Sequence, residues 1–298
     1  MRWRLTAPQK ATRRPQATLL SHFLVRTLTA IVLAAVFLGA LFSPERALFA
    51  ALATLIAGVG AYEWGKLCRM SRPRAVAYAA VCVALFALFT LFTFPAIGLM
   101  PAEVAGLVQQ AAFALAGVFW VVIAPFMLGM RWERMAAFLP ALGVLVIVPA
   151  AMALLAISPA LLLATLAIAW VSDTGAYLGG RAFGRRKLAP AISPGKTWEG
   201  VACGLGCVMI YAIIYPVLLP ESAVRPMAGG WTAYLLSAAL LCMVGVVGDL
   251  LESAMKRQAG VKDSGSALPG HGGILDRIES ATAILPLAAL LLHLAGPV

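Results

Sequence analysis

The chain has 298 residues, of which 62% are hydrophobic and only 12% are charged. This composition excludes a soluble globular protein, a disordered chain, a collagen and a coiled coil, because a lipid bilayer can cover such long apolar runs and water cannot. The formal net charge is +11. In a membrane protein this charge indicates basic cytoplasmic loops, so we expect no nucleic-acid partner.

Hydropathy predicts an all-α, polytopic integral membrane protein with about nine transmembrane helices, since a spanning helix needs about 20 mostly apolar residues. The first and last predicted spans are short. In chain order the predicted spans are residues 27–42, 47–67, 75–97, 104–130, 135–157, 160–178, 198–219, 232–251 and 281–294.

The basic residues alternate between successive hydrophilic segments. Placing the odd-numbered segments in the cytoplasm puts 21 of the 23 Lys and Arg residues there. The positive-inside rule therefore predicts a cytoplasmic N-terminus, with residues 1–26 as a basic cytoplasmic segment, and a C-terminus on the other side. The first 44 residues contain no acid. An organellar transit peptide therefore stays an alternative for this segment.

Acidic residues are costly near lipid, so their positions carry information. The first half of the chain has only scattered acids, Glu45, Glu63, Glu103 and Glu133, each near the end of a predicted span. We expect these to be solvated boundary residues, and we interpret residues 27–157 as an N-terminal transmembrane scaffold of about five helices. Most of the twelve acids lie further along the chain.

The predicted cytoplasmic loop of residues 179–197 contains no acid and five bases, Arg181, Arg185, Arg186, Lys187 and Lys196. Such a loop would attract a polyphosphate, and binding of anionic lipid headgroups is the alternative. Ser193 and Lys196 can present hydroxyl and ammonium donors at a helix start. Asp173 lies at the apolar end of a span, so we expect it to bind a cation, a ligand hydroxyl or a basic partner.

The second predicted cytoplasmic loop, residues 252–280, follows the eighth span and mixes acids with bases. On a helix that continues from this span, Asp249, Glu252, Ser253 and Lys256 recur at i, i+3, i+4 and i+7. This spacing places acid, hydroxyl and base on one helix face.

At the far end of this loop, Asp276 and Glu279 are three residues apart and face one way on a helix. Carboxylates on adjacent helix ends, joined by a glycine-rich loop, form a candidate site for Mg²⁺. A salt-bridge network that caps two helices is the alternative. His271, between Gly270 and Gly272, is either an ordinary loop histidine or a phosphate contact.

The stretch from Ser253 to Arg277 resembles the signature of the phosphatidate cytidylyltransferases, also called CDP-diacylglycerol synthases, and reads SAMKRQAGVKDSGSALPGHGGILDR. The stretches DTGAY, from Asp173, and ISPGKTWEG, from Ile192, are similar to that family's second characteristic region. The resemblance covers about 107 residues and leaves the N-terminal half out. The family usually has Asp where this chain has Glu279, which leaves open whether the longer side chain is a metal ligand.

This resemblance implies transfer of the cytidylyl group of CTP to phosphatidic acid, giving CDP-diacylglycerol and pyrophosphate, by metal-assisted attack of the lipid phosphate on the CTP α-phosphate. It implies Mg²⁺ as the cofactor, with two metal sites and an unidentified second ion. It also implies a multi-pass protein of the bacterial cytoplasmic membrane whose active site faces the cytoplasm, with residues 158–298 as a C-terminal catalytic region of about four helices. A homodimer stays open.

The resemblance implies three groups of site residues. The metal ligands are Asp249, Asp276 and Glu279. The catalytic group contains Lys256, Arg257 and Lys262 toward phosphates, Asp263 toward the metal or Lys262, and His271. The substrate-binding group contains Asp173, Ser193 and Lys196, which are assigned to CTP, together with Ser253 and Arg277.

Two other functions stay open from the residues. A CTP-dependent lipid kinase of the dolichol kinase type would share the architecture but transfer the γ-phosphoryl group. A cation transporter would also use acids within the membrane. Against a transporter, the acids crowd at one predicted face and do not cross the bilayer.

Overall fold

The computed structural model describes residues 16–94, 99–130, 137–218 and 230–295, so the first 15 residues of the predicted basic segment lie outside the described residues. Within these ranges, nine helices are long and apolar enough to cross a membrane. This confirms the predicted all-α, multi-pass architecture. The side of the membrane that the N-terminus faces stays a prediction.

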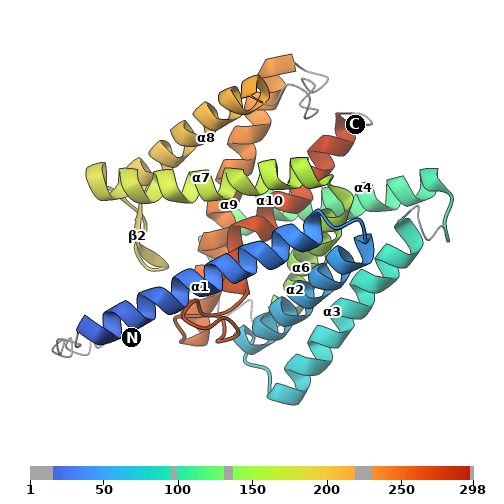
Figure 1. Cartoon of the computed structure of the whole chain (residues 1–298), viewed down its shortest axis with the longest axis horizontal. Helices are drawn as coiled ribbons and strands as arrows, with labels where there is room; N and C mark the ends of the chain where they lie inside the picture. Colours follow the sequence, from blue (N-terminus) through green and yellow to red (C-terminus); the bar gives the residue numbers. More distant parts are fainter. Residues whose placement is uncertain (1–15, 95–98, 131–136, 219–229, 296–298) are drawn as a thin grey trace.

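The elements run in a simple order (Figure 1). The helices are α1 (Gln16–Leu41), α2 (Arg46–Leu67), α3 (Arg72–Thr93), α4 (Ala102–Val118), the π-helical turn η1 (Phe119–Ile123), α5 (Ala124–Leu128), α6 (Leu139–Ala156), α7 (Pro159–Phe183), α8 (Trp198–Leu218), α9 (Gly230–Ala259) and α10 (Leu275–Leu294). The strands are β1 (Lys187–Ala189) and β2 (Ser193–Thr197). Because α4, η1 and α5 are continuous, they form the fourth span.

Four helices extend by five residues or more beyond the apolar runs that predicted them: α1 begins at residue 16 and not at 27, α7 continues from residue 178 to 183, and α9 and α10 are longer at their polar ends. Helix α9 continues eight residues past Leu251, and α10 begins at Leu275, before the predicted start at residue 281. The i, i+4 ion pair between Glu252 and Lys256 stabilises the polar end of α9. Asp276 lies in the first turn of α10, where a negative charge is favourable. Hydropathy detects neither effect, so it predicted the spans well and their polar ends poorly.

The basic loop after α7 also differs from expectation. Strands β1 and β2 pair antiparallel there, with Lys187 opposite Thr197. The resulting β-hairpin gives this loop a defined shape.

Helix α10 lies at the centre of the bundle and packs against α4, α6, α7 and α9 (Figure 1). Helices α7 and α8 pack closely through small residues, because a Cβ atom at Gly175 would overlap Cys207 and one at Gly179 would overlap Cys203. These cysteines therefore serve helix packing. All five cysteines are free.

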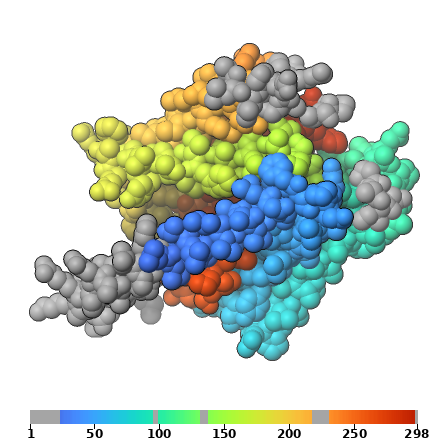
Figure 2. All heavy atoms as spheres, in the orientation of Figure 1, coloured from blue at the N-terminus to red at the C-terminus, as the bar shows by residue number. Residues whose placement is uncertain are grey.

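Helix α1 lies across one face of the molecule and buries the smallest share of its residues among the nine spans (Figure 2). Its Arg26 Nε donates a hydrogen bond to the Gly270 carbonyl oxygen at 2.8 Å, and Thr29 Oγ1 donates to the Pro269 carbonyl oxygen at 3.2 Å. The first span therefore contacts the loop between α9 and α10.

Candidate active site

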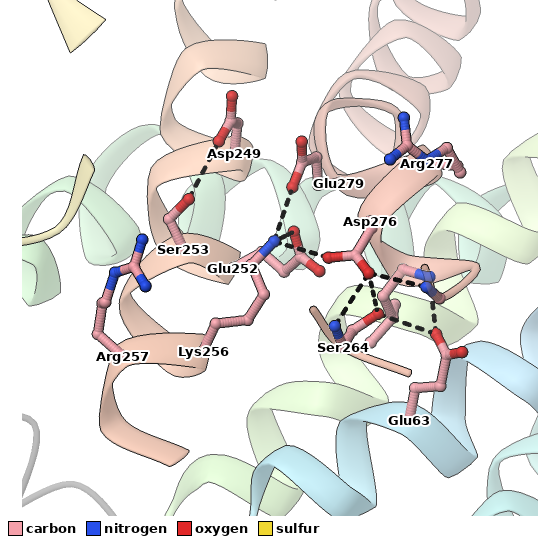
Figure 3. A network of polar contacts seen from close by, with 12 residues as sticks. Glu63, Asp249, Glu252, Ser253, Lys256, Arg257, Ser264, Asp276, Arg277 and Glu279 are labelled. Carbon is pink, nitrogen blue, oxygen red and sulfur yellow. Dashed lines mark hydrogen bonds and ion pairs between the residues drawn. The ribbon is translucent and has the colours of Figure 1, made fainter. Parts of the chain in front are cut away.

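Three carboxylates converge on one ammonium group where α9 meets the start of α10 (Figure 3). Lys256 Nζ lies 2.7 Å from Asp276 Oδ1, 3.0 Å from Glu252 Oε2 and 3.7 Å from Glu279 Oε2. The side chains of Glu252 and Asp276 are only 5% exposed. We call Lys256, Glu252, Asp276 and Glu279 the Lys256 cluster. The lysine offsets the repulsion among acids that burial would otherwise make costly.

A second cluster surrounds Asp249, which lies two helical turns before Lys256 on α9. Asp249 forms an ion pair with Lys196 of β2, and its Oδ1 accepts a hydrogen bond from Ser253 Oγ at 3.3 Å. Asp173 on α7 is close enough to interact electrostatically with both Asp249 and Lys196. Glu279 likewise interacts with Asp249, so the two clusters adjoin. We call Asp249, Lys196, Ser253 and Asp173 the Asp249 cluster.

The β-hairpin between α7 and α8 is fixed to the site through its backbone. The Glu199 carboxylate accepts the backbone N–H groups of Arg185 at 3.0 Å and Arg186 at 3.1 Å. Thr197 Oγ1 accepts the N–H of Gly200 at 3.1 Å and so caps α8. Arg257 Nε of α9 donates to the Ile192 carbonyl oxygen at 3.2 Å. These contacts hold Ser193 and Lys196 beside α9.

The loop between α9 and α10 carries the remaining predicted residues. Lys262 and Asp263 are exposed and form no hydrogen bond or ion pair with the described residues. The His271 carbonyl oxygen accepts hydrogen bonds from Arg277 Nε at 3.2 Å and Nη2 at 2.9 Å. His271 Nδ1 is buried without a hydrogen-bond partner in the described part of the chain. The structure thus keeps these four side chains outside both clusters.

Asp276 also binds the loop between α9 and α10 at two separate positions through hydrogen bonds. Its Oδ2 accepts hydrogen bonds from the backbone N–H groups of Gly273 at 2.8 Å and Ser264 at 2.9 Å, and from Ser264 Oγ at 3.0 Å. Its other oxygen contacts Lys256. The carboxylate therefore couples the conformation of the loop to the Lys256 cluster.

One residue of the site comes from a helix that we had interpreted as scaffold. Glu63 of α2 is only 3% exposed, and its carboxylate faces the loop between α9 and α10 (Figure 3). The expectation of a solvated boundary residue was wrong for Glu63, because the loop folds over this end of α2 and covers it. The available sequence signal was an acid located inside an apolar run, before the run ends at Leu67.

The charge and chemistry of the two clusters fit a hard divalent cation. Five carboxylates accompany two ammonium groups, which leaves three formal negative charges. Glu252 Oε1 is buried and has no hydrogen-bond partner among the described residues. Carboxylate oxygens are the donors that Mg²⁺ prefers. In the described ranges no group of three or more His, Cys, Asp or Glu side chains is already arranged around a metal position, since the Lys256 ammonium lies between the acids.

Comparison with known proteins identifies the family. Residues 24–295 match the family described as "Cytidylyltransferase family". The chain belongs to the cytidylyltransferase family. Every residue of the two clusters lies within the matched range of this cytidylyltransferase-family member. The loop contacts of α1 also lie within that range, which therefore includes nearly the whole described bundle.

Individual relatives in the cytidylyltransferase family agree with this assignment. A protein of Pseudomonas aeruginosa named "Phosphatidate cytidylyltransferase" is 38% identical over 91% of this chain and 97% of its own length. Proteins of the same name from Haemophilus influenzae and Brucella suis are each 46% identical, over 42% and 44% of this chain. Those two alignments cover 43% and 45% of the relatives' own lengths, so the stronger similarity is confined to part of each protein.

Proposed function

We propose that this chain transfers the cytidylyl group of CTP to phosphatidic acid and releases CDP-diacylglycerol and pyrophosphate. The observation that carries the proposal is the match to the Pseudomonas aeruginosa phosphatidate cytidylyltransferase, which extends over 91% of the chain. The two clusters support it, because they bring acids and bases together at the polar ends of membrane-spanning helices. Such a place suits a reaction between a water-soluble nucleotide and a lipid headgroup.

In the proposed reaction an oxygen of the lipid phosphate forms a bond to the α-phosphorus of CTP. The bond from the α-phosphorus to the oxygen bridging it to the β-phosphate breaks, and pyrophosphate leaves with that electron pair. No covalent enzyme intermediate is required, so we expect inversion at the α-phosphorus. Lys256, Arg257 and Lys262 would contact phosphates of the two substrates and reduce the repulsion between their negative charges.

The β-hairpin and Asp173 form the proposed CTP-binding side of the site. Lys196 supplies an ammonium group beside Asp249, and Ser193 supplies a hydroxyl group on the same strand. Ser253, one turn from Asp249, and Arg277 would bind substrate from α9 and α10. His271 would contact a phosphate, and Asp263 would bind metal or orient Lys262. The apolar surface between spans would hold the acyl chains.

We assign Mg²⁺ to Asp249, Asp276 and Glu279, with two metal positions and the second ion unidentified. When bound, Mg²⁺ would neutralise phosphate oxygens and polarise the α-phosphate. The chain's own contribution is to hold these carboxylates on two adjacent helices, through Lys196 and Ser253 for Asp249 and through Lys256 and the loop amides for Asp276.

The proposal includes an orientation. With the N-terminus in the cytoplasm, the end of α9 and the β-hairpin face the cytoplasm, where CTP is available. The proposed location is the bacterial cytoplasmic membrane, with residues 27–157 as scaffold and residues 158–298 as the catalytic region; a homodimer stays open.

The deciding experiment follows the label of radioactive CTP. Detergent-purified protein is incubated with phosphatidic acid, Mg²⁺ and CTP labelled at either the α- or the γ-phosphate. We expect the α-label in the lipid and the γ-label in pyrophosphate, and no product when EDTA is present. In a parallel incubation with a polyprenol in place of phosphatidic acid, a γ-label in the phosphorylated lipid alcohol would establish a lipid kinase instead. Cation flux into liposomes without CTP would support a transporter.

A further inference from the structure

Glu63 connects the first half of the chain to the centre of the site. Its Oε2 accepts hydrogen bonds from the Leu275 backbone N–H at 2.9 Å and from Ser264 Oγ at 3.1 Å, and its Oε1 accepts the Ile274 N–H at 3.2 Å. Ile274 and Leu275 form the N-terminus of α10. Glu63 thus binds the first turn of the helix that carries Asp276, although it lies more than 200 residues earlier in the sequence.

The partners of Glu63 are unusual for a buried acid. Among the described residues it has no Lys or Arg partner; Lys66, the nearest base in sequence, donates to the Met70 carbonyl oxygen instead. Three polar hydrogens and the positive end of α10 therefore stabilise the carboxylate. Burying a carboxylate that has hydrogen-bond donors but no positively charged partner lowers the stability of the fold. This cost suggests that it contributes more than packing.

Ser264 joins Glu63 directly to Asp276. Its hydroxyl oxygen lies 3.1 Å from Glu63 Oε2 and 3.0 Å from Asp276 Oδ2. A serine hydroxyl has one proton, so it can donate to only one of the two carboxylates at a time. A shift of either carboxylate therefore changes the hydrogen bonding of the other.

The loop is shaped to let Glu63 approach. A Cβ atom at Gly265 would overlap Glu63 Oε1, and one at Gly273 would overlap both Ser264 Oγ and Glu63 Oε2. Side chains at these two positions would thus separate the loop from α2. The close contact depends on two glycines as well as on the acid.

We infer that Glu63 is a positioning residue of the active site, which acts through Ser264 and the first turn of α10 to hold Asp276 in its reactive orientation. The inference rests on the proposed function. It gives α2 a role in the reaction, although Glu63 forms no hydrogen bond with any of the residues proposed to bind substrate or metal.

The test uses the full-length protein in detergent and the nearly isosteric substitution Glu63→Gln. The amide cannot accept hydrogen bonds at both ends, and it removes the negative charge facing the N-terminus of α10. Two experiments give four quantities. Steady-state kinetics gives kcat, the KM for phosphatidic acid and the Mg²⁺ concentration for half-maximal activity, and amide hydrogen exchange without metal or substrate gives the exchange rate of residues 264–275. Glu103→Gln is the matched control, since Glu103 lies in the first turn of α4 and is exposed.

For Glu63→Gln we expect kcat to fall about 10- to 100-fold, the range observed when a group that orients a metal ligand is removed. We expect the Mg²⁺ concentration for half-maximal activity to rise, the KM for phosphatidic acid to change less than about twofold because acyl-chain contacts are untouched, and exchange of residues 264–275 to become faster. Glu103→Gln should match the wild type in all four measurements.

A second variant, Ser264→Ala, keeps Glu63 and the α10 amide contacts but removes the hydroxyl bridge, so it tests the coupling even where Glu63→Gln lowers the yield of folded protein. It should lower kcat by about tenfold. The kcat of the double variant should equal that of Glu63→Gln alone, because both substitutions remove the same connection between Glu63 and Asp276.

Wild-type kcat in Glu63→Gln, or faster exchange with unchanged kcat and Mg²⁺ dependence, would overturn the inference. Failure of the wild type to form CDP-lipid would reject the proposed function, whereas unchanged exchange in Glu63→Gln would reject the positioning role by itself.

Discussion

The first five spans and the last four differ in how they accommodate acids. Of the acids in and between the first five spans, Glu133 lies outside the described residues; among the described ones, Glu45 and Glu103 are exposed near helix starts and only Glu63 is buried. In α7 to α10, Asp249, Glu252, Asp276 and Glu279 lie beside Lys196 or Lys256, and Glu199 accepts backbone N–H groups. Glu63 is also buried beside hydrogen-bond donors. Its donors, however, belong to the loop between α9 and α10 and to the start of α10, and not to its own half of the chain. The position of donors therefore decides which acids can be buried.

The largest expected effect lies in the last four spans. Asp276→Ala removes the carboxylate shared by Lys256 and the loop amides, and it should lower kcat by about 10²- to 10³-fold, in line with the loss of a key electrostatic contact in an active site. Membrane insertion should be unchanged, because the nine apolar spans are intact. Turnover in detergent and fractionation of membranes measure the two outcomes. Substantial activity in this variant would remove Asp276 from the proposed metal site.

Lys256→Met should have the next largest effect, on stability as well as turnover. It leaves Glu252, Asp276 and Glu279 facing one another without a cation, and losing one partner of a buried ion pair costs about 3–5 kcal/mol. Thermal unfolding in detergent should therefore begin at a markedly lower temperature. Lys256→Arg, which keeps the charge, is the control and should unfold close to the wild type. Equal stability of all three proteins would contradict the assigned role of Lys256.

The close packing of α7 on α8 provides a third comparison. In Gly179→Ala the new methyl group would overlap Cys203, and overpacking of this kind costs about 1–3 kcal/mol. Gly206→Ala on α8 is the matched control, because a Cβ atom there meets nothing within 4 Å. Thermal unfolding should distinguish the two. In a Cys203→Gly background, which lacks both overlapped side-chain atoms, Gly179→Ala should cost less stability, and an equal cost would mean that this contact does not limit the helix spacing.

The smallest effect is expected in the basic β-hairpin. Arg186→Ala should change kcat/KM for CTP by less than about threefold, because the backbone N–H that binds Glu199 is kept and the exposed neighbours Arg185 and Lys187 supply similar charge. Glu199→Ala removes the contacts that fix the hairpin and should have the larger effect. The two variants are compared by their kcat/KM for CTP, measured from initial rates at varied CTP concentrations. A complete loss in Arg186→Ala would show that this one guanidinium binds substrate.

Much of this architecture could be predicted from sequence because spanning helices are defined by local composition. The pairing on α9 was also predictable, since Glu252 and Lys256 are separated by one helical turn. The contact of Lys256 with Asp276 depends on how α9 and α10 pack, and spacing alone could only indicate that both helix ends carry acids.

Glu63 shows why the remainder was not predictable. Its neighbours in sequence suggested a helix end near water, and its actual partners are supplied by residues 264, 274 and 275. Only the three-dimensional packing of α2 beneath that loop brings them together. The β-hairpin was missed for a different reason, because its strands are three and five residues long and contain Pro194 and Gly195, which are both rare within strands.

The length of α9 has a further consequence for how the two substrates meet. Thirty residues at about 1.5 Å each make a helix roughly 45 Å long, whereas the hydrocarbon layer is about 30 Å thick. If α9 starts at the opposite surface, about ten residues of it, roughly from Leu250 onward, protrude into the headgroup zone. A lipid can then present its phosphate to Lys256 without leaving the leaflet, while the nucleotide reaches the same depth from the aqueous side.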